Sequence, residues 1–330
     1  MEIFIICLLF ALGIVLIVKG GDWFVDAAGW IAEVSGIPKF VIGATIVSLA
    51  TTLPELLVSL FATIESVTAT DPAIIAADRA IAAGNAIGSV TANIGLIMAI
   101  SIIFMPGKVP RRQFAPKAAM MIAACLILVI FSRGGSLGML PSVLLIIIFA
   151  VFITENVISA KRGSDPAVVE LADTGKPTKR VVTVNILKFI FGAAGIVIGA
   201  QLLVDYGKQL ATLIGVPEEI IAVTMIAIGT SLPELVTTIT AIAKKESSMS
   251  IGNIVGANIL DLTMILSVCS FVSGGTLEVP AQTVNIDLWA CLAVGAIAVV
   301  PTVITQRLRR WQGFALLGIY VAYVVYICVV

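Results

Sequence analysis

The chain has 330 residues, of which 59% are hydrophobic and 12% are charged, and its formal net charge is zero. A soluble domain carries about a quarter of charged residues, so this composition predicts a polytopic helical membrane protein. The balanced charge gives no indication of a nucleic-acid partner. The sequence contains no histidine, which excludes the commonest zinc ligand and the usual general base. Its five cysteines lie in apolar stretches without CxxC spacing, which favours buried packing over disulfides.

Apolar stretches long enough to cross a bilayer recur along the chain. The first has no basic region before it and no clear cleavage site after it, so we interpret it as a retained helix rather than a signal peptide. Ten spans are predicted, numbered here in chain order: 2–34, 39–64, 80–104, 113–132, 139–160, 182–213, 218–243, 249–273, 284–304 and 310–329.

The two halves of the chain repeat the same motifs. Residues 43–56 read GATIVSLATTLPEL and return as AVTMIAIGTSLPEL at residues 222–235. Residues 84–89 read GNAIGS and return as GNIVGA at residues 252–257. Similarity at fixed spacing over several blocks indicates an internal duplication. We therefore divide the chain into a first five-helix repeat, a cytoplasmic linker and a second five-helix repeat, at residues 1–160 (motifs within 43–94), 161–181 and 182–330 (motifs within 222–262).

Five spans per half require the second half to enter the membrane from the opposite side. Fifteen lysines and arginines, Lys117 among them, lie in the loops that follow the odd-numbered spans, and three lie on the opposite face. The positive-inside rule then places those loops in the cytoplasm and both termini on the extracytoplasmic side of the cell inner (plasma) membrane. Two inverted repeats of five helices, with spans 2 and 7 discontinuous, are the plan of secondary transporters.

Two glutamates give the clearest indication of function. Glu55 and Glu234 lie inside apolar spans, where an acid costs about 2.5–3.5 kcal/mol on insertion scales and usually serves a function. Pro54 and Pro233 precede them, and each removes a backbone donor and frees carbonyls in the turn before it. Proline kinks alone are common and structural, but acids in duplicated contexts argue against that explanation. Hydroxyl groups one turn before each acid share its helix face and complete an all-oxygen set suited to Ca²⁺ and Na⁺: Thr51, Thr52, Thr230 and Ser231.

Spans 3 and 8 add a second set of small and polar residues. Glycine pairs 84/88 and 252/256 allow close helix approach, and packing is their first explanation. Asn85 and Asn253 follow the first glycine of each pair and are expected to brace the broken helices by hydrogen bonds to backbone. Further polar residues lie one and two turns on, where they are expected to face the glutamates: Ser89, Asn93 and Asp261.

Other acids are less informative. Glu278 and Asp287 lie near helix ends and are expected to be solvated. Asp26 and Asp205 are paired by the repeat but lie near a membrane boundary, where a structural or gating role is expected.

These motifs resemble those of the calcium/cation antiporter superfamily, and most closely its prokaryotic sodium/calcium exchanger branch. The two alpha-repeats of that family carry GTSLPE and GNxxGSN-type motifs, which here read ATTLPE at 50–55, GTSLPE at 229–234, GNAIGS at 84–89 and GNIVGAN at 252–258. The resemblance implies a ten-helix fold with central cation sites between spans 2, 3, 7 and 8. It implies no cofactor, a lipid bilayer as surroundings, and function as a monomer.

The resemblance also implies a ligand set for the transported ions. It consists of the carbonyls of two residues, seven side chains and two central residues, in that order: Ser48 and Ala227; Thr51, Thr52, Glu55, Ser89, Thr230, Ser231 and Glu234; Asn93 and Asp261. Ala257 replaces the serine expected opposite Ser89, which removes one hydroxyl ligand. Potassium-dependent relatives also show an aspartate at the position of Asp261, and so do some potassium-independent ones.

The predicted function is antiport of Ca²⁺ against several Na⁺ by alternating access, and enzyme catalysis is not expected because no nucleophile–base or catalytic metal constellation is present. Proton-coupled members usually carry an acid where Gly88 and Gly256 stand. These acids are absent here, which favours sodium as the coupling ion. Two alternatives would use the same carboxylates to bind ions: a Ca²⁺/H⁺ antiporter and a potassium-dependent sodium/calcium exchanger. A cation channel is a further alternative, which inverted repeats with broken helices disfavour.

Overall fold

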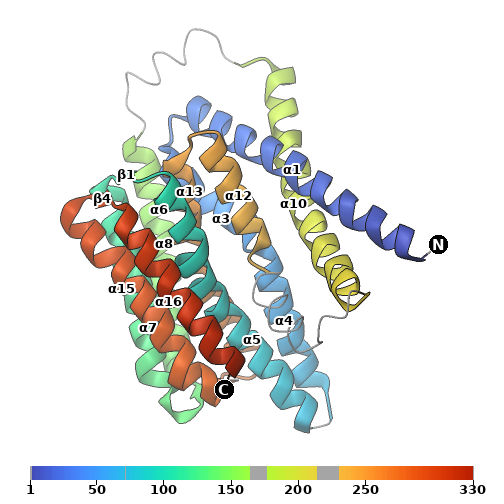
Figure 1. Ribbon diagram of the computed structural model, residues 1–330. Helices are drawn as coiled ribbons and strands as arrows, with labels where there is room; N and C mark the ends of the chain where they lie inside the picture. The colour runs from blue at the N-terminus through green and yellow to red at the C-terminus, as the bar shows by residue number, and fades with distance from the viewer. Residues whose placement is uncertain (1, 71, 164–176, 214–229, 330) are drawn as a thin grey trace.

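The computed structural model describes residues 2–70, 72–163, 177–213 and 230–329 (Figure 1). Within these ranges eight helices are long and apolar enough to cross a membrane, and the pair 39–51 and 53–68, bent by 43°, makes a ninth candidate span. These helices agree with the predicted spans to within a few residues at most ends. The expected span 218–243 lies partly outside the described residues, and its described part is the 12-residue helix α12 (Leu232–Ala243).

The first half of the chain forms spans 1 to 5. Its helices are α1 (Glu2–Ser35), α2 (Lys39–Ile42), η1 (Gly43–Val47), α3 (Ser48–Thr51), α4 (Leu53–Thr68), α5 (Pro72–Ala92), η2 (Asn93–Met98), α6 (Ala99–Phe104), α7 (Arg111–Phe131), η3 (Ser132–Gly134) and α8 (Met139–Gly163). The second half contains α10 (Lys179–Leu213), α12, α13 (Ser247–Ile259), η4 (Leu260–Ile265), α14 (Leu266–Val272), η5 (Thr283–Asp287), α15 (Leu288–Thr305) and α16 (Arg310–Val329). The expected linker 161–181 is shorter at both ends, because α8 and α10 extend into it.

Span 2 breaks at Thr52, and the equivalent residue of span 7, Ser231, has the same backbone conformation. Thr52 has φ −82° and ψ −4°, and Ser231 has φ −85° and ψ 3°. Each is followed by a helix with a proline in its first turn, where a missing N–H breaks no hydrogen bond within that helix. Glu55 and Glu234 lie in the same first turns, where the positive end of the helix dipole favours a carboxylate. The duplicated motif therefore begins a helix in the same way in both halves.

Two short ribbons join the halves at opposite ends of the bundle. β1 (Gly107–Lys108) pairs antiparallel with β4 (Arg307–Leu308), and β2 (Ser136–Leu137) pairs antiparallel with β3 (Leu277–Glu278). β1 and β3 follow spans 3 and 8, whereas β2 and β4 follow spans 4 and 9. Because α7 runs from β1 to β2, the ribbons lie at opposite ends. In each ribbon, the strand after the third span of one half pairs with the strand after the fourth span of the other half. A twofold axis in the membrane plane relates the two ribbons in this way.

The long helices α1 and α10 cross each other beside the rest of the bundle (Figure 1). Glycines allow the close crossing. A Cβ atom added to Gly20 would lie 2.8 Å from the carbonyl oxygen of Gly192, and one added to Gly199 would lie 2.8 Å from that of Gly13. Small residues permit such contacts between membrane helices. The crossing pair therefore forms a unit of its own, and we name it the α1–α10 pair.

Glycines also hold α13 against span 2. A Cβ atom added to Gly252 would lie 2.2 Å from the carbonyl oxygen of Phe40, and one added to Gly256 would lie 2.6 Å from Ser48 Oγ. The packing role expected for this glycine pair is confirmed. Their equivalents Gly84 and Gly88 have no described heavy atom within 4 Å of an added Cβ. Both line a cavity. The segment equivalent to the one that Gly252 and Gly256 contact lies outside the described residues.

Two charged residues are buried in the bundle, contrary to expectation. Lys117 was counted with the loop charges, but its side chain is fully buried on α7 and pairs with Glu155 of α8. Asp287 was expected to be solvated, but it is 7% exposed and accepts hydrogen bonds from Thr283 Oγ1 at 2.9 Å and Tyr323 at 3.0 Å. Both have partners because an unpaired charge inside a membrane protein is costly.

The glycine contacts give a prediction about stability. Gly252→Ala should lower the free energy of unfolding by about 1–3 kcal/mol, because the new methyl group overlaps a backbone carbonyl that cannot move without separating the helices. Gly318→Ala, at an exposed position of α16 where an added Cβ meets no described atom within 4 Å, is the control and should change little. Thermal unfolding of the purified protein in detergent measures both, and equal melting temperatures for the two variants would contradict the packing described here.

Candidate cation site

The first turns of α4 and α12 bring their acids into one polar cluster. Glu55 at the start of α4 is 1% exposed, and Glu234 at the start of α12 is 0% exposed. Ser89 of α5 connects the two motifs, because its Oγ donates to Glu55 Oε1 at 3.3 Å and lies 2.9 Å from Ser231 Oγ. The hydroxyl groups of Thr51 and Thr52 lie near the carboxylate of Glu234. Side chains of spans 2, 3 and 7 therefore share one buried site.

Many polar atoms of this cluster have no hydrogen-bond partner among the described residues. They are Glu55 Oε2, Thr52 Oγ1, both oxygens of Glu234, both oxygens of Asp261, and both side-chain polar atoms of Asn93. A buried polar atom without a partner costs about 1–3 kcal/mol and is rare in native proteins. A group of such atoms, mostly oxygens, fits a bound cation, which would satisfy them together.

The three acids of the cluster repel one another. Glu55 interacts electrostatically with Glu234 and Asp261, and Asp261 interacts with Glu234. Like charges in a water-poor interior are unfavourable unless a cation neutralises them. Within the described ranges, no three acidic, cysteine or histidine side chains come close enough to hold a metal ion by themselves. Hydroxyl, amide and carbonyl oxygens would therefore complete the coordination, as hard cations prefer.

Asn93 and Asp261 occupy equivalent turns of spans 3 and 8. Each lies in a stretch of wide π-helical turns, η2 and η4, and each is fully buried. Such turns insert an extra residue into a helix and are frequent at functional sites. One repeat therefore has an amide, Asn93, at the same structural position where the other has an acid, Asp261.

Two asparagines brace the breaks. Asn85 Nδ2 donates to the carbonyl oxygen of Glu55 at 3.2 Å and to Ser59 Oγ at 3.0 Å. The expected hydrogen bond to the backbone of a broken helix is thus confirmed for Asn85. Asn253 binds side chains instead: it accepts from Thr51 Oγ1 at 3.2 Å and donates to Thr237 Oγ1 at 3.1 Å.

The remaining predicted ligands are placed less directly. The carbonyl of Ser48, which the resemblance implies as a ligand, accepts the backbone N–H of Thr52 at 2.9 Å. Pro54 has no N–H, so the carbonyl that loses its helical donor is that of Ala50. Thr230 is half-buried and lines the cavity. Ala227 lies outside the described residues.

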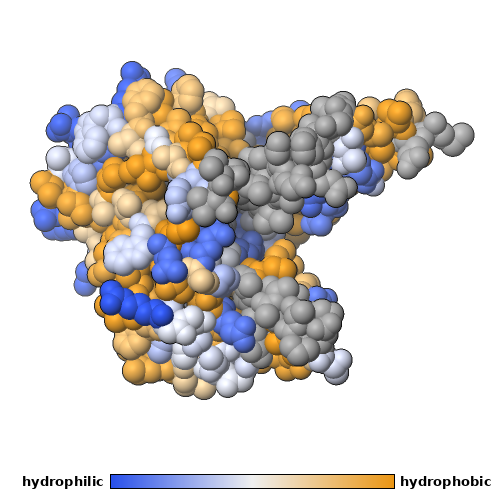
Figure 2. All heavy atoms as spheres, turned by 60° about the horizontal axis from the view of Figure 1, so that its bottom comes forward, coloured by the Kyte–Doolittle hydropathy of each residue, from blue (hydrophilic) through white to orange (hydrophobic). Residues whose placement is uncertain are grey.

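A cavity of about 700 Å³ reaches the cluster from one end of the bundle. It extends from Ser89 and Thr230 to Pro280 and Ile327, and α4, α5, α10, η5 and α16 contribute to its wall. Figure 2 turns this end forward and shows hydrophilic residues gathered near its middle. Sequence reasoning missed the contributions of α10 and α16, among them Lys208 and Tyr323, because no motif marks them.

Inverted repeats, broken helices and a buried acidic cluster open to one end together define a secondary cation transporter. The chain belongs to the sodium/calcium exchanger protein family, which it matches over residues 5–157 and 184–329. It is a multi-pass membrane transporter and not an enzyme.

Individual relatives agree with this assignment. The chain is 30% identical over 238 residues to the uncharacterized membrane protein MJ0091 of Methanocaldococcus jannaschii, covering 72% of this chain and 74% of that protein. It is 32% identical over 141 residues to the sodium/calcium exchanger MaX1 of Methanosarcina acetivorans, covering 43% of this chain and 40% of MaX1. The solved structure of the sodium-calcium exchanger NCX_Mj has the same fold, with a TM-score of 0.80, 27% identity and 98% of each chain covered. The predicted fold class, an all-helical protein of inverted repeats, is confirmed.

Mutual repulsion in the cluster gives a prediction about stability and binding. Asp261→Asn removes one buried charge, so the cation-free protein should unfold at a higher temperature than the wild type. The rise in melting temperature on adding Ca²⁺ should be smaller, because the variant binds the ion more weakly. Thermal unfolding in Na⁺-free buffer with and without Ca²⁺ measures both effects.

Glu65→Gln is the control for that experiment, because Glu65 is an exposed acid at the far end of α4. It should leave both melting temperatures unchanged. An Asp261→Asn variant with a full Ca²⁺ response would show that Asp261 takes no part in binding.

Proposed function

We propose that the protein exchanges Ca²⁺ for several Na⁺ across the membrane by alternating access. The observation that carries this proposal is the buried cluster of Glu55, Glu234 and Asp261, whose oxygens lack partners among the described residues. Family membership supports it. So does the likeness to NCX_Mj, a sodium-calcium exchanger whose structures include crystals soaked with Na⁺ and Ca²⁺.

The proposed ion site contains all the ligands that the sequence motifs indicate. Ca²⁺ bridges Glu55 and Glu234, and the Na⁺ ions occupy the same cluster in its absence. The full set is Ser48, Thr51, Thr52, Glu55, Ser89, Asn93, Ala227, Thr230, Ser231, Glu234 and Asp261. One chain supplies both halves of the cluster, so neither repeat is expected to function alone. The monomer is the proposed functional unit.

Electrostatic repulsion couples ion binding to movement. An empty cluster leaves two glutamates and an aspartate in the interior without counter-charge, and such a state resists closure on both sides. Either Ca²⁺ or the set of Na⁺ ions neutralises the acids and permits the switch. The α1–α10 pair slides along the bundle during the switch, and its glycine contacts keep the two helices together as one unit.

The orientation in the membrane follows from the loop charges. Lysines and arginines concentrate on the end that carries β1, β4 and the loop between α12 and α13. The positive-inside rule makes that end cytoplasmic and puts both termini on the other side of the plasma membrane. The cavity described above then opens to the outside.

Sodium is the proposed coupling ion because Gly88 and Gly256 stand where proton-coupled relatives usually carry an acid. Calcium uptake into reconstituted vesicles, with Na⁺, K⁺ and H⁺ gradients imposed one at a time, tests this choice. Uptake with a Na⁺ gradient alone supports the proposal. Uptake with a pH gradient alone indicates a Ca²⁺/H⁺ antiporter, and a requirement for K⁺ together with Na⁺ indicates a potassium-dependent exchanger.

The carboxylates themselves give a prediction about transport. Glu234→Gln, and separately Glu55→Gln, should abolish Na⁺-driven Ca²⁺ uptake while leaving the folded protein intact, because the amide keeps the shape but not the charge. Uptake in vesicles measures the loss, and size-exclusion chromatography checks folding. Substantial calcium flux through either variant would refute the assignment of these residues.

A further inference from the structure

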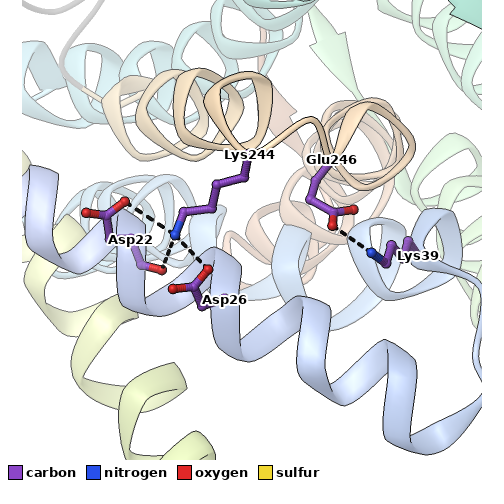
Figure 3. Close-up of polar contacts among 5 residues, drawn as sticks. All are labelled: Asp22, Asp26, Lys39, Lys244 and Glu246. Atoms are coloured by element: carbon purple, nitrogen blue, oxygen red, sulfur yellow. Dashed lines mark hydrogen bonds and ion pairs between the residues drawn. The ribbon is translucent and has the colours of Figure 1, made fainter.

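Two lysines form ion pairs at the end of the molecule opposite the cavity (Figure 3). Lys244 follows α12 and reaches α1, where its Nζ lies 2.6 Å from Asp26 Oδ1, 3.4 Å from Asp22 Oδ1 and 3.3 Å from the carbonyl oxygen of Asp22. Lys39 at the start of α2 lies 2.6 Å from Glu246 Oε1. The first group joins the α1–α10 pair to the end of α12. Lys39 joins α2 to the residue before α13, and it also lies 3.6 Å from Glu33 Oε1 near the end of α1, the helix that precedes it in the chain.

Packing next to Lys244 closes the same end. Gly21 of α1 lies against α12, because an added Cβ would be 2.7 Å from Thr240 Oγ1 and 3.2 Å from Val236 Cγ1. Partial burial disfavours the charged ammonium of Lys244, but the hydrogen bond to Asp26 and the charges of Asp26 and Asp22 outweigh it and raise its pKa. The lysine is therefore charged at neutral pH. At the other end, α10 lines the open cavity.

The charges that form the ion pair of Lys244 with Asp26 are not repeated at the equivalent positions of the other repeat. At the offset that relates the GTSLPE-type motifs, Asp26 corresponds to Asp205 and Lys244 corresponds to Glu65. The equivalent pair consists of two acids, which repel rather than attract. Inverted repeats alone would give the two access states similar structures and energies, and this charge difference breaks their equivalence.

We propose that Lys244, with Asp22 and Asp26, is a one-sided latch that fastens the α1–α10 pair to α12 and favours the state open at the cavity end. The proposal rests on the alternating access of the proposed function. Lys244 and Asp26 are positioning residues that touch no transported ion. Ion pairs near the surface contribute little to stability, so the latch can open in every transport cycle. Its opening would let ions reach the cluster from the end where Lys244 lies.

Charge reversal tests the latch. Lys244→Glu places a third acid beside Asp22 and Asp26, and the double variant Lys244→Glu/Asp26→Lys restores an opposite pair. Lys245→Glu is the matched control, because Lys245 is exposed in the same loop and has no ion pair among the described residues. Asp26→Asn is a milder variant that removes attraction without adding repulsion, and it keeps the test decisive should Lys244→Glu fail to fold.

The readout is access to α12 from the end where Lys244 lies. A cysteine introduced by Val236→Cys, in a background without the native cysteines because Cys7 is exposed, is labelled with a hydrophilic maleimide in reconstituted vesicles. Val236 is half-buried against α1 and should become accessible when the latch opens. Lys244→Glu and Asp26→Asn should raise the labelling rate roughly two- to fivefold, as expected for loss of a surface ion pair. The double variant should return it toward the wild-type rate.

Equal labelling in Lys244→Glu, Asp26→Asn and the Lys245→Glu control would overturn the latch. Calcium uptake driven by a Na⁺ gradient is measured in the same vesicles. Wild-type vesicles without such uptake would count against the proposed exchange instead, whatever the labelling shows. The two failures are therefore distinguishable.

Discussion

The rest of the structure depends on the burial of three carboxylates whose oxygens have few hydrogen-bond partners among the described residues. Glu55 and Glu234 are placed in the first turns of α4 and α12, where the helix dipole gives a partial positive charge but no full counter-charge. Asp261 adds a third acid from η4. This arrangement is possible because α4 and α12 both begin in the middle of the bundle and provide two helix N-termini there. The glycine contacts of α13 and the asparagine braces then hold the breaks in position.

The duplication explains which features are shared and which differ. The breaks at Thr52 and Ser231 have nearly the same backbone angles, since backbone geometry follows the repeated proline motif. Charged side chains are not repeated in the same way. Counting from the equivalent strands β1 and β3, Lys117 and Asp287 occupy equivalent positions, yet one is a cation bound to Glu155 and the other an acid bound by hydroxyl groups. The repeats therefore preserve the framework and vary its electrostatics.

Local pattern was sufficient to predict the spans, the breaks and the acids at their centre, because hydrophobic length and proline act through the chain itself. It was insufficient where partners lie far apart in sequence. The pairs Lys244 with Asp26 and Thr51 with Asn253 are separated by 218 and 202 residues, and no spacing rule links them. The wide turns η2 and η4 were also missed, since one extra residue in an apolar helix leaves no mark in composition. Lys117 was misplaced because its partner Glu155 lies on another helix.

Charge balance connects the asymmetry of the cluster with the choice of coupling ion. With Glu55, Glu234 and Asp261 all ionised, three monovalent cations neutralise the cluster, whereas one Ca²⁺ leaves a single negative charge. That charge requires either one more monovalent cation beside the Ca²⁺ or a proton on one acid. If Asp261 were an amide, like its counterpart Asn93, Ca²⁺ alone would balance the two glutamates. The difference between Asn93 and Asp261 therefore determines the charge that has to be supplied beside Ca²⁺: one monovalent cation, Na⁺ or K⁺, or one proton.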